Sequence, residues 1–143
     1  MKVALLSTSE SKGGAAIAAR RLMAGLRLAS CDCQLFVLRG HNPQGGIVGP
    51  ARKWEHIISL FSPHLDALLL SLFEKSTERL FSIAFSSTGA LRKAVAFGPD
   101  VINLHWVNSG FLSVRSIGQI RLPVVWTLHD MWAFTGGCHY SEQ

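Results

Sequence analysis

The sequence has few charged residues, few cysteines and no long uninterrupted apolar run. Charged residues make up 16% of its 143 residues and hydrophobic residues 48%, a balance typical of a folded domain and unlike a disordered chain. The apolar run at residues 3–6 has the length of a strand and is too short for the core of a signal peptide. The apolar stretch 57–73 is interrupted by Pro63, His64 and Asp66 and is shorter than the roughly 20 residues that a spanning helix needs. We therefore expect one cytoplasmic domain, residues 1–143, with no membrane-spanning helix.

Metal-ligand spacings are also scarce. The three cysteines are an odd number and form no CxxC pair, so reduced thiols are the default. Cys31, Cys33, Cys138 and His139 can be counted as four ligands, but a Cys-x-Cys at a strand start is poor zinc spacing. We expect no metal and no cofactor, and we interpret Cys31 and Cys33 as small core residues.

The net charge of +5 arises in residues 1–56, which hold eight basic and three acidic side chains. Such a surface can meet nucleic acid, an anionic membrane or a phosphorylated ligand. No Lys/Arg run or interleaved aromatic stripe supports nucleic acid, so we expect no nucleic-acid partner. Arg20, Arg21 and Arg27 are interpreted as the solvated face of a helix.

Apolar runs and turn residues predict an α/β fold. A strand at 2–7, a Gly-containing loop, a helix at about 15–29 and a strand at 34–38 form a βαβ unit. The rest of the chain is predicted as a short strand at 46–48, helix over 51–80 broken near Ser62-Pro63, helix 88–97, strand 101–105, helix 110–120 and strand 124–128. Right-handed crossovers would arrange these strands in a Rossmann-like, doubly wound parallel sheet whose order reverses beside the first strand.

The unusual residues fall where ligands bind in such sheets, at the carboxyl ends of strands beside the reversal. The first strand ends in a Ser/Gly-rich loop with Gly13-Gly14, which either lets a helix N-terminus approach an anion such as phosphate or only permits a tight turn. A later strand ends at His105-Trp106, with Asn108 close behind, and this cluster is typical of a polar-ligand site, although a Trp packed under a loop is the alternative.

The last predicted strand ends at His129, next to Asp130. A neighbouring carboxylate can orient an imidazole and fix its tautomer. His129 is therefore a candidate general base, hydrogen-bond donor or metal ligand.

One apolar stripe runs along the predicted helical region 51–80. Its members are Ile57, Phe61, Leu65, Leu68 and Leu72. The favoured interpretation is that this stripe packs on the sheet. The alternative is peripheral contact with an anionic membrane, because Arg52, Lys53, Lys75 and Arg79 flank the stripe.

Three segments together resemble the N-terminal domain of family 4 of the glycosyltransferases, the bacterial group-1 enzymes of polysaccharide assembly. They are Ser7-Thr8 through Gly13-Gly14-Ala15-Ala16, residues 99–106 and, most specifically, residues 125–140. The resemblance implies a GT-B enzyme, in which two facing Rossmann-like domains enclose the active site. Such an enzyme moves a sugar from a nucleotide-sugar donor to a glycan or lipid-linked acceptor, retains anomeric configuration and usually needs no metal.

The resemblance also implies roles for individual residues. Gly13 and Gly14 would lie against the donor diphosphate and the acceptor, and His129 would hydrogen-bond the donor sugar, with Asp130 in support. The implied acceptor wall consists of His105, Trp106 and Asn108.

The C-terminal domain that binds the nucleotide in this family has no counterpart in residues 1–143. We therefore expect an incomplete, acceptor-side half with little or no transferase activity of its own, working in the cytoplasm or at the inner face of the plasma membrane. The alternative is a non-catalytic α/β module that binds a sugar or a nucleotide.

Overall fold

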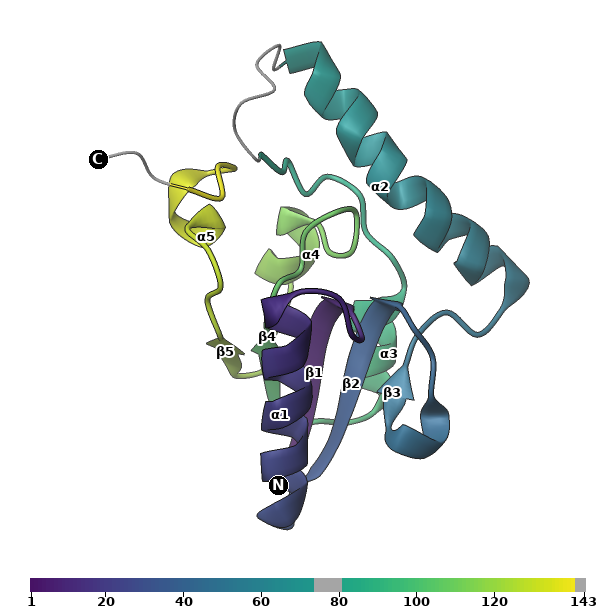
Figure 1. Ribbon diagram of the computed structural model, residues 1–143, viewed down its shortest axis with the longest axis vertical. Helices are drawn as coiled ribbons and strands as arrows, with labels where there is room; N and C mark the ends of the chain where they lie inside the picture. The colour runs from purple at the N-terminus through teal and green to yellow at the C-terminus, as the bar shows by residue number, and fades with distance from the viewer. Residues whose placement is uncertain (74–80, 141–143) are drawn as a thin grey trace.

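A computed structural model describes residues 1–73 and 81–140 and shows a Rossmann-like α/β fold (Figure 1). Five parallel strands form one sheet in the order β3-β2-β1-β4-β5. The strands are β1 (Lys2–Ser9), β2 (Asp32–Arg39), β3 (Ile47–Val48), β4 (Val101–Leu104) and β5 (Val124–Trp126). The order reverses beside β1, between β1 and β4, which confirms the doubly wound topology predicted from the sequence.

Helices cover both faces of the sheet, because successive side chains of a strand point to opposite faces. On one face, Val3 and Leu5 of β1 pack with Ala19 and Met23 of α1 (Gly14–Leu28). On the other face, Ala4 and Leu6 pack against α3 (Ala90–Ala96) and the segment around Phe111, close to α4 (Val114–Gly118). The remaining helices are α2 (Lys53–Phe73), α5 (Trp132–Thr135) and the 3-10 turn Pro43–Gly45.

Two predicted helices differ from the structure. The helix expected over 110–120 is confined to α4, because Ser109 and Gly110 both have positive φ and form a turn instead. The break expected near Ser62-Pro63 is absent, since α2 runs through Pro63. Proline removes one backbone donor from a helix but does not always end it. The end of the predicted 51–80 segment, with Lys75 and Arg79, lies outside the described residues.

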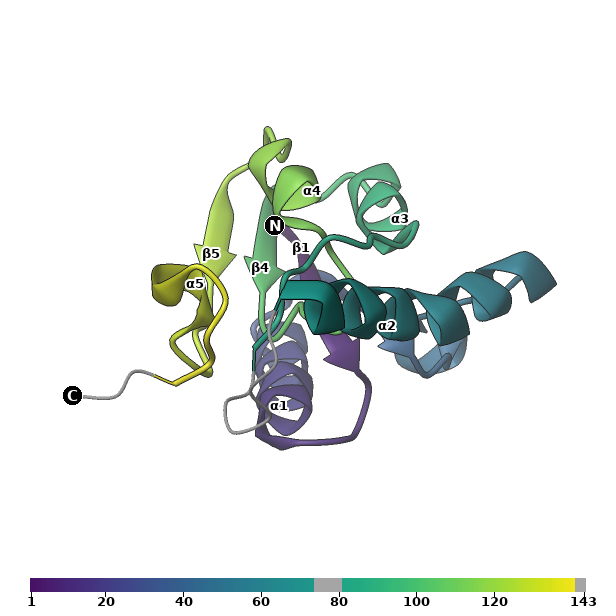
Figure 2. The ribbon, with the colours of Figure 1, turned by 90° about the horizontal axis from the view of Figure 1, so that it is seen from above.

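The prediction that the apolar stripe of α2 packs on the sheet is wrong. Phe61, Leu68 and Leu72 are 66%, 60% and 70% exposed, whereas Ser62 and Asp66 of the same helix are buried. The face of the sheet that carries Ala4 and Leu6 is already covered by α3 and the segment around Phe111. Figure 2 shows the consequence: α2 crosses the molecule above the carboxyl edge of the sheet and covers neither face.

Polar contacts hold α2 in this orientation. Near its start, Lys93 of α3 places its Nζ 2.7 Å from Glu55 Oε2 and 3.1 Å from the carbonyl oxygen of Gly49. Burial raises the pKa of the Glu55 carboxyl, but hydrogen bonds from Lys93 and from backbone N–H groups outweigh burial and lower this pKa to about 2. Farther along, Ser86 N donates to Asp66 Oδ1 at 2.8 Å.

Among the described residues, no helix has both the length and the apolar character required to cross a bilayer.

Candidate functional site

The candidate site lies at the point where the strand order reverses, at the carboxyl ends of β1 and β4. Thr8, at the end of β1, donates its hydroxyl to the carbonyl oxygens of Trp106 (3.0 Å) and Asn108 (2.9 Å). The backbone N–H of Thr8 donates to the same Trp106 oxygen at 2.8 Å. The chain that leaves β4 is therefore fixed across the end of β1.

A second set of contacts fixes the end of β5 beside β4. Asn103 Nδ2 donates to the carbonyl oxygen of Val125 (3.3 Å) and to Thr127 Oγ1 (3.1 Å), and Thr127 N donates to Leu104 O at 2.8 Å. The residues that follow the two strands consequently meet at the same edge, as the sequence predicted for His105 and His129.

His105 and His129 form a stacked, hydrogen-bonded pair. His105 Nδ1 lies 3.0 Å from His129 Nε2, and the two ring centroids are 5.2 Å apart with an interplanar angle of 23°. His105 is 2% exposed, while His129 is exposed. Burial, together with the nearby His129, lowers the pKa of His105 to about 4, so its ring is neutral at pH 7. A neutral, immobilised His105 therefore orients the accessible ring of His129.

Asp130 does not orient His129, which corrects the expectation from their adjacency. Its Oδ2 accepts from Trp106 Nε1 at 2.8 Å and lies in hydrogen-bond contact with His139 Nδ1, while Oδ1 accepts from Trp132 N at 3.0 Å. Burial raises the pKa of Asp130, but these hydrogen bonds, that of His139 foremost, outweigh burial and lower it. The carboxylate is thus ionised at neutral pH and holds the indole of Trp106.

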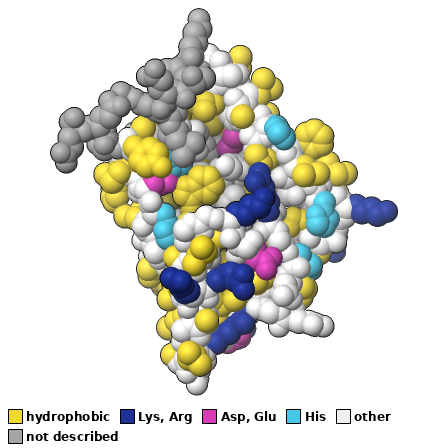
Figure 3. Space-filling view, in the orientation of Figure 1, with side chains coloured by type: hydrophobic (Ala, Val, Ile, Leu, Met, Phe, Trp, Pro, Cys, Tyr) yellow, Lys and Arg dark blue, Asp and Glu magenta, His cyan; other side chains and the backbone are white. Residues whose placement is uncertain are grey.

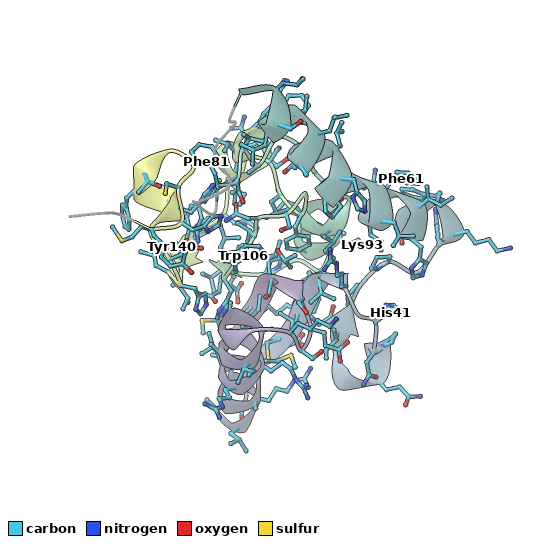
Figure 4. The ribbon with its side chains drawn as sticks, turned by 45° about the horizontal axis from the view of Figure 1, so that its top comes forward. His41, Phe61, Phe81, Lys93, Trp106 and Tyr140 are labelled. Atoms are coloured by element: carbon cyan, nitrogen blue, oxygen red, sulfur yellow. The ribbon has the colours of Figure 1, made fainter. Side chains whose placement is uncertain are left out.

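His139 and Ser82 extend this network, and sequence reasoning missed both. His139 is 1% exposed, and its Nε2 lies 2.8 Å from Ser82 Oγ. The carbonyl oxygen of Ser82 accepts from Trp132 Nε1 at 2.8 Å. The rings of Trp106 and His139 lie with their centroids 5.7 Å apart, and Figure 4 labels Trp106 and Tyr140, the residue after His139, on the same side of the molecule. The sequence signal for His139 is its place in the segment 125–140, which indicates a possible metal ligand and does not indicate a partner for Asp130.

A small hollow brings most of the predicted site residues together. Its lining includes His105, Trp106, Asn108, His129 and Asp130. Trp106 is half-buried and Asn108 is buried, so His129 is the most accessible polar side chain of the five.

Gly13 and Gly14 do not line this hollow. They are exposed at the start of α1, where Gly13 has φ +88° and no side chain caps the helix within the described structure. The backbone N–H of Ile17 donates to Gly13 O, which is the first hydrogen bond of the helix. The backbone N–H groups that precede Ile17 in the first turn therefore have no acceptor within the helix and are available to an anion.

The described residues contain no group of three or more His, Cys, Asp or Glu side chains that could hold a metal ion.

A family model described as a glycosyl transferase 4-like domain matches residues 13–142, a span that includes every predicted site residue. The chain belongs to this family and represents the N-terminal domain of a GT-B glycosyltransferase of the group-1 type. Neither the curated proteins nor the solved structures gave a match.

We expect His105 to make the domain sensitive to mild acid. Its folded pKa of about 4 lies below the ordinary value of 6.5, so its stabilising contribution is complete above pH 6.5 and is lost as the pH falls toward 4. Between pH 7 and pH 5 this loss amounts to about 2 kcal/mol of unfolding free energy. Urea unfolding at the two pH values measures it.

The variant His105→Gln should lose less stability than the wild type over the same pH interval. His64→Gln serves as the control, because His64 is exposed on α2 and should leave the wild-type pH dependence intact. An equal loss in His105→Gln and wild type would show that another group causes the acid sensitivity.

Proposed function

We propose that this chain forms the acceptor-side half of a retaining glycosyltransferase of the hexosyltransferase type. The enzyme moves a sugar from a nucleotide-sugar donor to a glycan or lipid-linked acceptor. The observation that carries the proposal is the accessible His129, which follows β5 beside the reversal of strand order and whose ring contacts the buried, neutral His105. Its other ring nitrogen, Nδ1, has no hydrogen-bond partner among the described residues and is available to a ligand.

In this proposal His129 hydrogen-bonds the donor sugar near the reacting carbon and acts by positioning and electrostatic stabilisation. It need not accept a proton, because the departing donor phosphate can take the proton of the acceptor hydroxyl. The exposed first turn of α1, with Gly13 and Gly14, faces the donor diphosphate.

Trp106 provides the exposed part of the acceptor wall, where an indole face can pack on sugar C–H groups. His105 and Asn108 are buried beneath it, so they support the wall: His105 through His129, and Asn108 through its carbonyl bond with Thr8. Asp130 supports the same wall because it accepts the indole N–H of Trp106.

The proposed setting is bacterial polysaccharide biosynthesis in the cytoplasm, at the inner face of the plasma membrane, without a metal, another cofactor or nucleic acid. Peripheral contact with an anionic membrane belongs to the same proposal.

A calorimetric titration of the chain distinguishes this function from that of a non-catalytic module. The ligands are UDP-glucose, UDP-N-acetylglucosamine, GDP-mannose and a short-chain prenyl diphosphate sugar as acceptor analogue. We expect weak binding of the acceptor analogue and little binding of the nucleotide sugars, because nucleotide recognition belongs to the other half of a GT-B enzyme. Trp106→Ala should abolish acceptor binding, and Trp54→Ala, remote from the hollow, should not. Tight binding of a nucleotide sugar by the chain alone would instead favour the binding module.

A further inference from the structure

Ser82, His139 and Asp130 form a hydrogen-bonded chain beside the candidate site. Ser82 Oγ lies 2.8 Å from His139 Nε2, and His139 Nδ1 is in hydrogen-bond contact with Asp130 Oδ2. The hydroxyl, the two imidazole nitrogens and the carboxylate therefore follow one another in the order that activates a serine nucleophile. This arrangement is recognised by its geometry and not by the order of its residues in the sequence. The proposed sugar transfer has no role for Ser82 or His139.

The charge of Asp130 decides the direction of both hydrogen bonds. Burial raises the pKa of Asp130, but hydrogen bonds, that of His139 foremost, outweigh burial and lower it, so the ionised carboxylate can only accept. His139 therefore donates from Nδ1, and in a neutral imidazole this leaves Nε2 without a proton. Ser82 Oγ–H consequently donates to Nε2, and an imidazole in this state can remove the hydroxyl proton.

The backbone on both sides of Ser82 is fixed. Ser82 N donates to Gly137 O at 2.9 Å, and Ser82 O accepts from Trp132 Nε1 at 2.8 Å. A Cβ on Gly137 would collide with the ring of Phe81, so only glycine allows the two segments to approach this closely. Ser82 is therefore held in place relative to His139 before a ligand binds.

Half-buried Ser82 lines a cavity of about 330 Å³. His139 is 1% exposed and is not part of the lining, so it contacts Ser82 from the protein side. Figure 3 shows hydrophobic side chains gathered around a small acidic area on the side of the molecule that carries α5. Apolar walls of this kind suit the acyl group of a carboxylic ester. The apolar residues of the lining include Ile83, Val114, Ile117, Trp126 and Trp132.

Two backbone N–H groups of the same cavity are available to an oxyanion. Ile83 and Gly136 both line the cavity, and neither backbone N–H has a hydrogen-bond acceptor among the described residues. Ile83 directly follows Ser82, and the backbone N–H of the residue after a nucleophile is a common oxyanion donor. Such donors stabilise the negative charge that develops on the carbonyl oxygen of an ester under attack.

We propose that Ser82 is the nucleophile of an esterase activity towards carboxylic esters with a small apolar acyl group. Ser82 Oγ forms a bond to the carbonyl carbon while His139 Nε2 removes the hydroxyl proton. The bond between the carbonyl carbon and the alcohol oxygen then breaks, and His139 gives the proton to the departing alcohol. Water next attacks the acyl-serine, again losing a proton to His139, and Ser82 Oγ leaves and regains that proton. The products are a carboxylic acid and an alcohol, and no oxidant or cofactor takes part.

A fluorophosphonate with a short alkyl chain tests the nucleophile directly. Ser82 Oγ would form a bond to phosphorus with loss of fluoride, and peptide mass spectrometry of the full chain locates the label. We expect labelling at Ser82 that is absent in Ser82→Ala and about 100-fold slower or more in His139→Gln, which lacks the base. Ser71→Ala is the matched control, because the exposed Ser71 donates its hydroxyl to Leu68 O and contacts no histidine in the described structure.

Hydrolysis of p-nitrophenyl butyrate tests the complete reaction. Release of p-nitrophenolate by the wild type should fall about 100-fold or more in Ser82→Ala and stay unchanged in Ser71→Ala. Asp130 acts as a positioning residue, so Asp130→Asn should slow the labelling of Ser82 at a temperature at which circular dichroism shows this variant to be folded. The reason is that His139 would lose the acceptor that keeps the proton on Nδ1.

Absence of labelling at Ser82 in the wild type overturns the proposal. Labelling that His139→Gln leaves unchanged also overturns it, because the hydroxyl would then react without its base. Ester hydrolysis that is equal in wild type and a folded Ser82→Ala variant has the same meaning. No nucleotide sugar or acceptor is present in either assay, so these outcomes are independent of whether the chain takes part in sugar transfer.

Discussion

Replacing Asp130 by asparagine is expected to lower the unfolding free energy of the domain by about 2–4 kcal/mol. The ionised carboxylate accepts from three donors, on Trp106, Trp132 and His139. An asparagine amide has one oxygen and one NH2 group, so at least one of these donors would meet another donor. The indole N–H of Trp106 or the backbone N–H of Trp132 would then be left without an acceptor in a half-buried position.

Urea unfolding at pH 7, followed by tryptophan fluorescence, measures this effect. Asp32→Asn is the control, because the Asp32 side chain is 59% exposed and its nearest cation, Lys2 Nζ, is 3.8 Å away; it should change stability by less than about 1 kcal/mol. The lowered pKa of Asp130 means that its contribution is present above the ordinary carboxyl pKa and disappears as the pH falls through the folded value. The difference in unfolding free energy between wild type and Asp130→Asn should therefore shrink in acid. Equal losses of stability in Asp130→Asn and Asp32→Asn at pH 7 would contradict the assigned network.

The fold could be predicted closely from local sequence patterns. The short apolar runs that became β1, β2 and β4 end in turn residues, and the Ala-rich stretch that became α1 has a helical period. The orientation of α2 could not be predicted in the same way. Periodicity shows which side chains share a side of a helix, but it does not show which side meets the protein. That choice depends on Lys93 and Ser86, which are remote in the sequence and bind Glu55 and Asp66.

The candidate site was predictable to a similar degree. Parallel strands bring their carboxyl ends together, so the meeting of His105 and His129 followed from topology. The hydrogen-bond partners of Asp130 could not be predicted, because sequence adjacency to His129 says nothing about where the carboxylate points. The contact between His139 and Ser82 joins residues 57 positions apart, and no spacing rule predicts it.

The second large effect is expected for His129→Ala, which should lose most of the activity in sugar transfer. His129 is exposed, and its ring contacts His105 at one nitrogen only, so its removal should leave the fold largely intact. Loss of one preorganised hydrogen-bond donor at a reacting centre lowers turnover by about 100- to 1,000-fold. The exposed His64 of α2 offers a matched control, since His64→Ala removes an imidazole far from the hollow.

The most direct test is the rate of sugar transfer by the complete product of the gene, as wild type and as His129→Ala. Radiolabelled UDP- and GDP-sugars are supplied with membranes of the source organism, and the label that enters glycan or lipid-linked product is counted. The account predicts measurable transfer by the wild type and by His64→Ala, and a fall of about 100-fold or more in His129→Ala. Transfer that is undiminished in a folded His129→Ala variant would contradict it.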